Sequence, residues 1–175
     1  MTTSTEYPAV PVPRIFSWSG IFAGTFLFLA IEATFGILGM KIFASARPGI
    51  GVGFGIWMVV LSIISLYFAG RLAGRLTGAT TQNLGMYAGL VTFGMSIFTS
   101  VLLMVFALGN TVSRGTDIAA SVTRMGDLLA SSGYWLFVAL VLAMISAALG
   151  GIHGAAMSGL RLKSKSSALE AKRAA

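Results

Sequence analysis

One acidic residue, Glu32, lies within a long apolar stretch, and its type and position suggest chemistry more clearly than any other side chain. A carboxyl group inside a bilayer is costly, and such groups commonly mark functional sites. Equal counting from the outer ends of the apolar stretches brings three hydroxyl side chains to about the same depth: Ser62, Thr99 and Ser100. These four residues predict an intramembrane polar layer. Because burial disfavours a charged carboxyl group, we expect Glu32 to be protonated and to donate a hydrogen bond to a hydroxyl.

Three roles for Glu32 fit the sequence. It could join helices as a neutral acid, handle protons or cations, or contact a partner subunit or bound cofactor. The first role predicts that Glu32→Gln leaves assembly intact. The second predicts that the same substitution abolishes a transport or proton-coupled activity.

His153 is the single histidine, and it lies among small residues in the segment 150–156. Small neighbours leave room for a flat macrocycle, and a neutral imidazole can ligate haem or bacteriochlorophyll. One histidine supplies one axial ligand, which suffices for a chlorophyll. The alternative is a hydrogen-bonding residue near the membrane boundary, and in that case we expect no cofactor other than bound lipids.

The remaining inventory for catalysis is small. The chain has no cysteine, one histidine and five carboxylates. The lack of cysteine excludes disulfides, thiolate metal sites and cysteine nucleophiles. The sequence contains no Walker loop, dinucleotide fingerprint, zinc motif or nucleophile–base pair. We therefore predict no catalytic residue, no metal site and no enzyme activity.

Four apolar stretches must position these residues. The chain is 56% hydrophobic and 10% charged, whereas a soluble domain is about 25% charged. A membrane-spanning helix needs about 20 apolar residues, and the stretches lack the two-residue alternation of barrel strands. We predict an all-α, polytopic membrane protein with a four-helix bundle and spans at about 17–40, 54–75, 84–108 and 134–157.

A weak internal repeat suggests that the bundle consists of two tandem helical hairpins. Ile64-Ser65 is followed five residues later by Ala-Gly, and Ile145-Ser146 is followed five residues later by Gly-Gly. Both pairs lie in spans that open with a tryptophan. Such a pattern is typical of duplicated hairpins in the same orientation.

Basic residues predict the orientation, because Lys and Arg accumulate on the cytoplasmic side. Eight of the twelve lie before the first span, at the end of the second span and after the fourth. We therefore expect both termini in the cytoplasm and the chain in the bacterial inner membrane. Arg71 and Arg75 should contact lipid headgroups. The net charge of +7 then reflects the membrane surface, and we expect no nucleic-acid partner.

Three segments flank or connect the spans. The leader 1–16 is proline-rich and should be extended. The tail 161–175 is basic. The outer loop 109–133 has apolar residues at helical spacing, which fits either a short helix on the membrane surface or a solvated connector.

Glycines spaced by four residues place small faces on each predicted helix. Such faces let helix backbones approach closely in lipid. One interpretation is packing within the bundle, and the other is that one strip docks a partner chain. The strip we consider for a partner consists of Gly70, Gly74 and Gly78, and the other pairs are Gly20/Gly24, Gly85/Gly89 and Gly150/Gly154.

The first hundred residues carry a recognisable pattern. The run 51–76 begins with three alternating glycines, continues through Ile-Trp and Ser-Ile-Ile-Ser, and ends with Ala-Gly-Arg-Leu-Ala-Gly-Arg-Leu. Gly-Leu-Val-Thr-Phe follows at 89–93, and Ser17-Trp18 precedes the run. This resembles a group of uncharacterised bacterial four-helix membrane proteins, sometimes labelled PhnA-like. Their pattern has His and Trp where this chain has Ala88 and Phe93. The resemblance implies the four-helix fold and no activity.

These observations favour a non-catalytic role. The many packing faces and few chemical groups predict an accessory or scaffolding subunit of a larger bacterial membrane complex, of respiratory or photosynthetic type. The partners would then be other membrane-protein subunits. The alternative is a small transporter or channel that self-associates and uses Glu32 and the hydroxyl layer.

Overall fold

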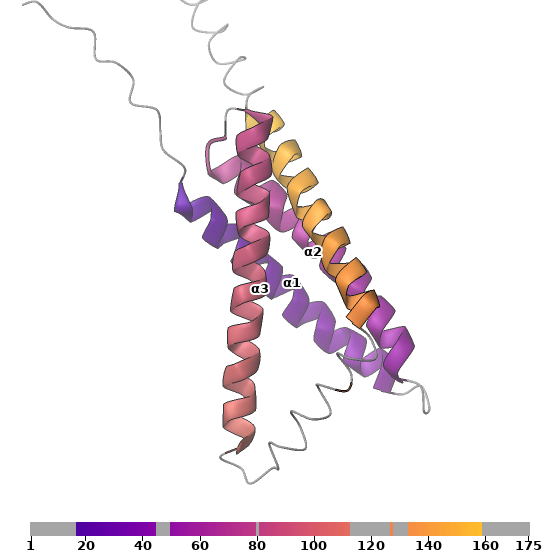
Figure 1. The fold of residues 1–175 in the computed structure, drawn as a ribbon. Coiled ribbons are helices and arrows are strands. Elements are labelled where there is room, and N and C mark those ends of the chain that lie inside the picture. Colours follow the sequence, from indigo (N-terminus) through magenta and orange to yellow (C-terminus); the bar gives the residue numbers. More distant parts are fainter. Residues whose placement is uncertain (1–16, 45–49, 80, 113–126, 128–132, 159–175) are drawn as a thin grey trace, which may run out of the picture.

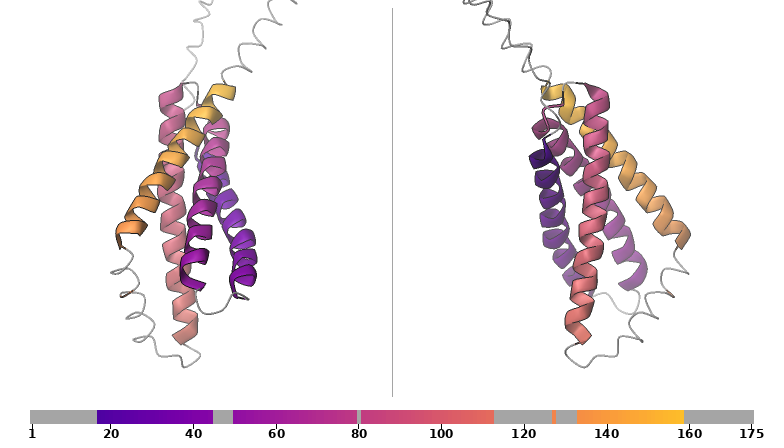
Figure 2. Two further views of the ribbon diagram at one scale, coloured as in Figure 1. Left: turned by 90° about the vertical axis from the view of Figure 1, so that its right-hand side faces the viewer. Right: turned by 60° about the vertical axis from the view of Figure 1, so that its left-hand side comes forward.

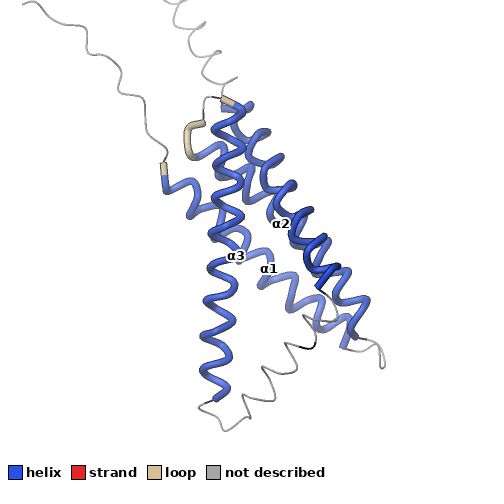
Figure 3. Tube along the Cα trace, viewed as in Figure 1, coloured by secondary structure: helices blue, strands red, loops and turns tan. Residues whose placement is uncertain are grey.

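The computed structural model describes residues 17–44, 50–79, 81–112, 127 and 133–158. In this part of the chain all regular structure is helical (Figures 1 and 3). The helices are α1 (Trp18–Ala44), α2 (Ile50–Leu76), α3 (Gln82–Val112) and an unlabelled fourth helix (Gly133–Ser158). Each contains a segment long and apolar enough to cross a membrane. The prediction of an all-α, multi-pass membrane protein with four spans is confirmed.

The helices begin and end a few residues outside most of the predicted spans. The first continues to Ala44 and the second already begins at Ile50. A helix does not stop at the hydrocarbon boundary, because each additional residue adds a backbone hydrogen bond. The leader 1–16, the tail 161–175 and most of the loop 109–133, including its predicted surface helix, lie outside the described residues.

Helices that follow each other along the chain run in opposite directions. One end of the bundle contains the first residues of α1 and α3 and the last residues of α2 and the fourth helix, and we call it the closed end. The opposite end is the open end. Toward it, α3 and the fourth helix separate from each other and from α1 and α2 (Figures 1 and 2).

Glycines hold the closed half of the bundle together. A Cβ atom added to Gly70 or Gly74 of α2 would collide with the carbonyl oxygens of Ala147 and Gly151 in the fourth helix. The reverse holds for the fourth helix, where Gly150 and Gly154 face the carbonyl oxygens of Tyr67 and Arg71. Gly70 and Gly150 occupy equivalent positions in the two helices, as do Gly74 and Gly154. Each of them faces the carbonyl of the residue three positions before its equivalent glycine in the other helix. The α2–fourth-helix contact is thus a parallel pair with approximate two-fold symmetry.

The odd-numbered helices pack onto this pair through glycines of their own. Gly24 of α1 lies against the Ala69 carbonyl oxygen of α2, which a Cβ atom would approach to 2.7 Å. Gly85 and Gly89 of α3 lie against the carbonyls of Gly151 and Ala147. Such contacts bring backbones together and gain dispersion energy that larger side chains would prevent.

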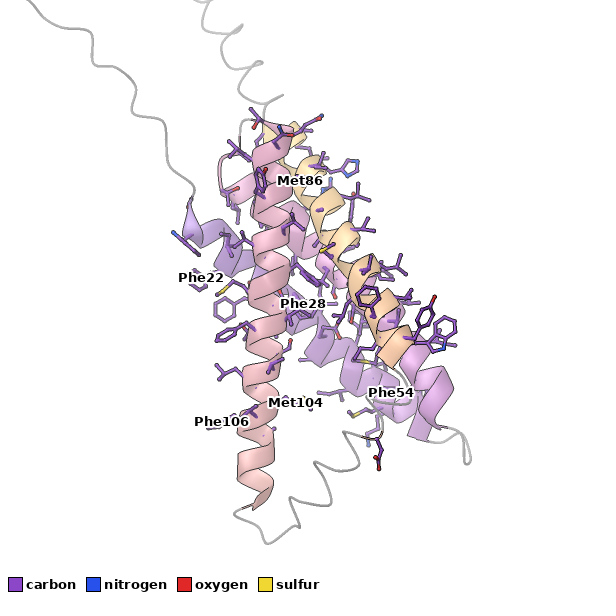
Figure 4. The ribbon with its side chains drawn as sticks, in the orientation of Figure 1. Phe22, Phe28, Phe54, Met86, Met104 and Phe106 are labelled. Atoms are coloured by element: carbon purple, nitrogen blue, oxygen red, sulfur yellow. The ribbon has the colours of Figure 1, made fainter. Side chains whose placement is uncertain are left out.

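The remaining core is small and lies in the middle of the bundle. It consists of buried residues from α1, α2 and the fourth helix, with Leu29 and Phe93 packed against them: Phe28, Leu66, Ala69, Ala143 and Ala147. Figure 4 labels Phe28 among the helices, whereas Phe22 and Phe106 project away from them. Phe106 is 72% exposed. Outward apolar side chains of this kind suit a lipid surrounding.

Candidate functional site

Glu32 lies between α1 and α2 and accepts a hydrogen bond from a serine of α2. The Ser65 Oγ atom is 3.0 Å from Glu32 Oε1. Ser65 is completely buried, whereas Glu32 is partly exposed. The Ser65 hydroxyl also lies 3.2 Å from the Ser62 carbonyl oxygen of its own helix. The carboxyl group therefore joins α1 to α2 through Ser65.

The hydroxyl residues expected around Glu32 lie differently. Ser62 contributes its backbone carbonyl to the Ser65 hydroxyl, and its side chain is not the partner of Glu32. Thr99 Oγ1 donates to the Met95 carbonyl of its own helix at 2.8 Å. Ser100 is partly buried and forms no hydrogen bond to Glu32 in the described part of the chain. The four residues are not brought into one hydrogen-bonded layer.

The partner of Glu32 differs because the helix register differs from equal counting. Gly39 of α1 lies against the Trp57 indole, and a Cβ atom there would be 2.5 Å from Trp57 Nε1. Trp57 Nε1 also donates to the Phe35 carbonyl at 3.2 Å. Relative to equal counting, these contacts shift α2 by about one turn toward the open end, so that Ser65 faces Glu32. Ser62 and Ser65 share a helix face because they are three residues apart.

Buried hydroxyl groups occur on all four helices, and sequence counting missed most of them. They include Thr25, Ser65, Thr92, Ser96 and Ser146, each 9% exposed or less. Ser146 Oγ donates across the helix pair to the Ile63 carbonyl at 2.7 Å. Ser96 Oγ is buried without a hydrogen-bond partner among the described residues. The signal that could have found Ser65 and Ser146 is their equivalent place in the internal repeat.

An apolar groove of about 350 Å³ runs along the contact of α1 and α2. Its lining is hydrophobic, and Ile31 and Ile64 within it are the chain neighbours of Glu32 and Ser65. Its other walls come from both helices: Phe35, Trp57, Val60, Leu61 and Phe68. The groove thus adds no polar route to the carboxyl group.

Gly70 and Gly74 face the fourth helix, but Gly78 does not continue their strip. The helix α2 ends at Leu76, and Gly78 has a φ of +70°, with no atom of the described residues within 4 Å of an added Cβ. Glycine is favoured at such a left-handed position after a helix. The strip predicted from spacing is therefore two glycines used within the chain, followed by a glycine that ends the helix.

His153 lies on the fourth helix beside α2. Its Nδ1 atom is 2.9 Å from the Leu149 carbonyl oxygen, and its ring centroid is 6.0 Å from that of Tyr67. Because a carbonyl only accepts, Nδ1 carries the hydrogen and Nε2 is left for another partner. The side chain is exposed. A haem or bacteriochlorophyll bound by His153 would have to be ligated by Nε2, on the outer surface of this helix pair.

The two arginines of α2 differ in their surroundings. Arg71 Nη2 donates to the Met157 sulfur at 3.2 Å, and its Nε atom is buried without a hydrogen-bond partner among the described residues. Arg75 is exposed, and its backbone carbonyl accepts a hydrogen bond from Ser158 at 3.4 Å. Both lie near the closed end, where the sequence predicts headgroup contacts.

The described residues contain no group of three or more His, Cys, Asp or Glu side chains that could hold a metal ion. Glu32 and Asp127 are the two carboxylates of that part of the chain. Comparisons with family models, with curated proteins and with solved structures found no match for this chain.

Proposed function

We propose that this chain is a non-catalytic accessory or scaffolding subunit that binds another membrane protein through the open half of its bundle. The observation that carries the proposal is the exposure of α3 near the open end. Seven consecutive residues, 101–107, are exposed, and they cover every side of the helix. The start of the fourth helix is similar, with Tyr134 and Trp135 more than 70% exposed.

Two further observations support a partner over lipid alone. The closed half buries its small residues against backbone, which is how helices recognise one another in lipid. Gly55 of α2 and Gly94 of α3 are exposed, and among the described residues no atom lies within 4 Å of a Cβ atom added to either. Such positions admit close approach by another helix. A larger respiratory or photosynthetic assembly is the class of partner that fits a subunit with this little chemistry.

Isolation in mild detergent followed by native mass measurement tests the proposal. We expect the chain to co-purify with larger, different membrane subunits. Recovery as a homo-oligomer alone would contradict the proposal and would favour the transporter alternative.

A pair of matched variants makes the test specific to α3. Leu102→Ala with Phe106→Ala removes two exposed side chains one turn apart, 56% and 72% exposed. We expect loss of the partner with unchanged folding of the chain. Phe22→Ala with Phe26→Ala is the control on α1, where the side chains are also exposed. Equal effects of the two double variants would count against a partner on α3.

The transporter alternative has one observation in its favour, the Ser65–Glu32 hydrogen bond within the span region. Glu32→Gln keeps a hydrogen-bond acceptor and removes the titratable proton. Under the scaffolding proposal, this variant retains its partners. Loss of a proton-coupled flux in reconstituted vesicles, with assembly intact, would support the alternative.

A further inference from the structure

Four side chains gather on the outer surface of the α2–fourth-helix pair near the closed end. Tyr67 and Arg71 are one turn apart on α2, and His153 and Met157 are one turn apart on the fourth helix. Gly150 and Gly154 set the pairing, because they face the carbonyls of Tyr67 and Arg71. The helices are therefore close enough for Arg71 to contact Met157 and for Tyr67 to contact the His153 ring.

Among the described residues, the guanidinium group of Arg71 meets no strong acceptor. Its Nε and Nη2 atoms form the edge that binds two oxygens of one anion. Here Nη2 meets a thioether sulfur, a weak acceptor, and Nε is buried with no partner among the described residues. The described carboxylates lie elsewhere, Glu32 in α1 and Asp127 before the fourth helix. An unpaired buried donor on a cation is costly.

The neighbouring rings add capacity for an anion. His153 holds its Nδ1 hydrogen on the Leu149 carbonyl, which fixes the ring and leaves Nε2 available. In the imidazolium form of histidine both ring nitrogens are donors, and in that form Nε2 can donate to an anion. The Tyr67 hydroxyl forms no hydrogen bond in the described part of the chain. Met157 is 42% exposed and flexible, so it can move away from the guanidinium edge.

We propose that this cluster binds the phosphate group of an anionic phospholipid. Arg71 would hold two phosphate oxygens through Nε and Nη2, with His153 and Tyr67 beside them. The location favours a lipid, because the cluster lies near the ends of two membrane-spanning helices and His153 is on their exposed surface. Arg75, one turn further, adds a second positive charge that favours an anionic lipid over a zwitterionic one. This inference does not depend on the proposed function.

Lipid titration of the delipidated full chain, read by native mass spectrometry, tests the site. The probes are phosphatidylglycerol, phosphatidylcholine and inorganic phosphate. We expect a saturable phosphatidylglycerol adduct that phosphatidylcholine does not match. Equal binding of the two lipids would overturn the proposal. Displacement of phosphatidylglycerol by inorganic phosphate at equal concentration would show that the site takes free phosphate and would overturn its assignment to a lipid.

Variants separate this site from general surface charge. Arg71→Gln should weaken phosphatidylglycerol binding by about tenfold or more, because it removes the positive charge and the paired donors that hold two phosphate oxygens. Arg75→Gln removes the same charge from an exposed position and should have a clearly smaller effect. Equal losses in the two variants would reduce the site to surface charge and contradict the proposal.

A second variant keeps the test valid if Arg71→Gln fails to fold. Met157→Ala removes the thioether from the guanidinium edge and leaves every proposed phosphate ligand in place. We expect tighter phosphatidylglycerol binding in this variant. Weaker or unchanged binding would mean that Met157 does not compete with the phosphate, which contradicts the proposed geometry.

Discussion

At the scale of single residues, the Glu32–Ser65 pair is a side-chain hydrogen bond that joins α1 to α2. A hydrogen bond between membrane helices contributes about 0.6 kcal/mol on average and up to about 1.7 kcal/mol. Ser65 is fully buried and donates to the carboxyl group, so its loss leaves Glu32 without that partner. The contact is therefore expected to matter for stability at the upper part of this range.

The first prediction compares two serines of the same helix. Ser65→Ala should lower the free energy of unfolding by about 1–2 kcal/mol, measured by SDS titration with circular dichroism. Ser62→Ala is the control, because the Ser62 side chain is not the partner of Glu32. An equal cost at the two positions would contradict the observed pairing.

The sequence identified the intramembrane acid but not its partner. The position of Glu32 follows from residue type alone, since charge in an apolar stretch is conspicuous. Which serine pairs with Glu32 depends on the register between α1 and α2, and contacts such as that of Gly39 with Trp57 set this register. Counting from assumed span ends is uncertain by about one turn, which is the difference between Ser62 and Ser65.

At the scale of helices, the parallel contact between α2 and the fourth helix is one of the closest backbone contacts of the fold. Spacing by four correctly placed Gly70 and Gly74 on one face, and likewise Gly150 and Gly154. Spacing could not say which helix each face meets. Spacing also could not show that α2 ends before Gly78. A glycine four residues after another can lie on the same packing face, or it can be the residue that terminates the helix.

The second prediction tests this contact with two glycines in helix interiors. Gly150→Ala places a Cβ atom against the Tyr67 carbonyl, so backbone must move, and overpacking of this kind costs about 1–3 kcal/mol. The Cβ atom of Gly94→Ala meets no atom of the described residues within 4 Å, so this variant should be neutral or slightly stabilising, because alanine favours helix. SDS unfolding curves compare the two.

The control also defines the contradicting result. If Gly150→Ala is as stable as Gly94→Ala, the two helices do not approach through their backbones. If both variants are destabilised equally, Gly94 does not lie on an open face of α3.

At the scale of the whole molecule, an even number of spans places the start of the first helix and the finish of the last on the same side of the membrane. The start of α1 and the finish of the fourth helix lie at the closed end (Figure 1). The sequence predicts that this side is cytoplasmic. Since the chain has no cysteine, single introduced thiols can report the side without background.

The third prediction is a labelling pattern in intact cells. A membrane-impermeant maleimide should react with Tyr134→Cys at the open end and not with Ser19→Cys or Gln82→Cys at the closed end. All three positions are exposed. The latter two should react after the cells are opened. Labelling of Gln82→Cys and Tyr134→Cys from the same side would contradict the four-span topology.

The glycine contact between α2 and the fourth helix also has a consequence for biosynthesis. Gly70 and Gly74 leave the ribosome about 80 residues before Gly150 and Gly154, which at about 5–20 residues per second takes on the order of 4–16 s. During that interval the small face of α2 has no permanent neighbour in the bilayer. In a chain that stops before its last helix, the Gly70 and Gly74 face of α2 stays without its helix neighbour. The insertion machinery or a quality-control protease would then encounter this face in the bilayer.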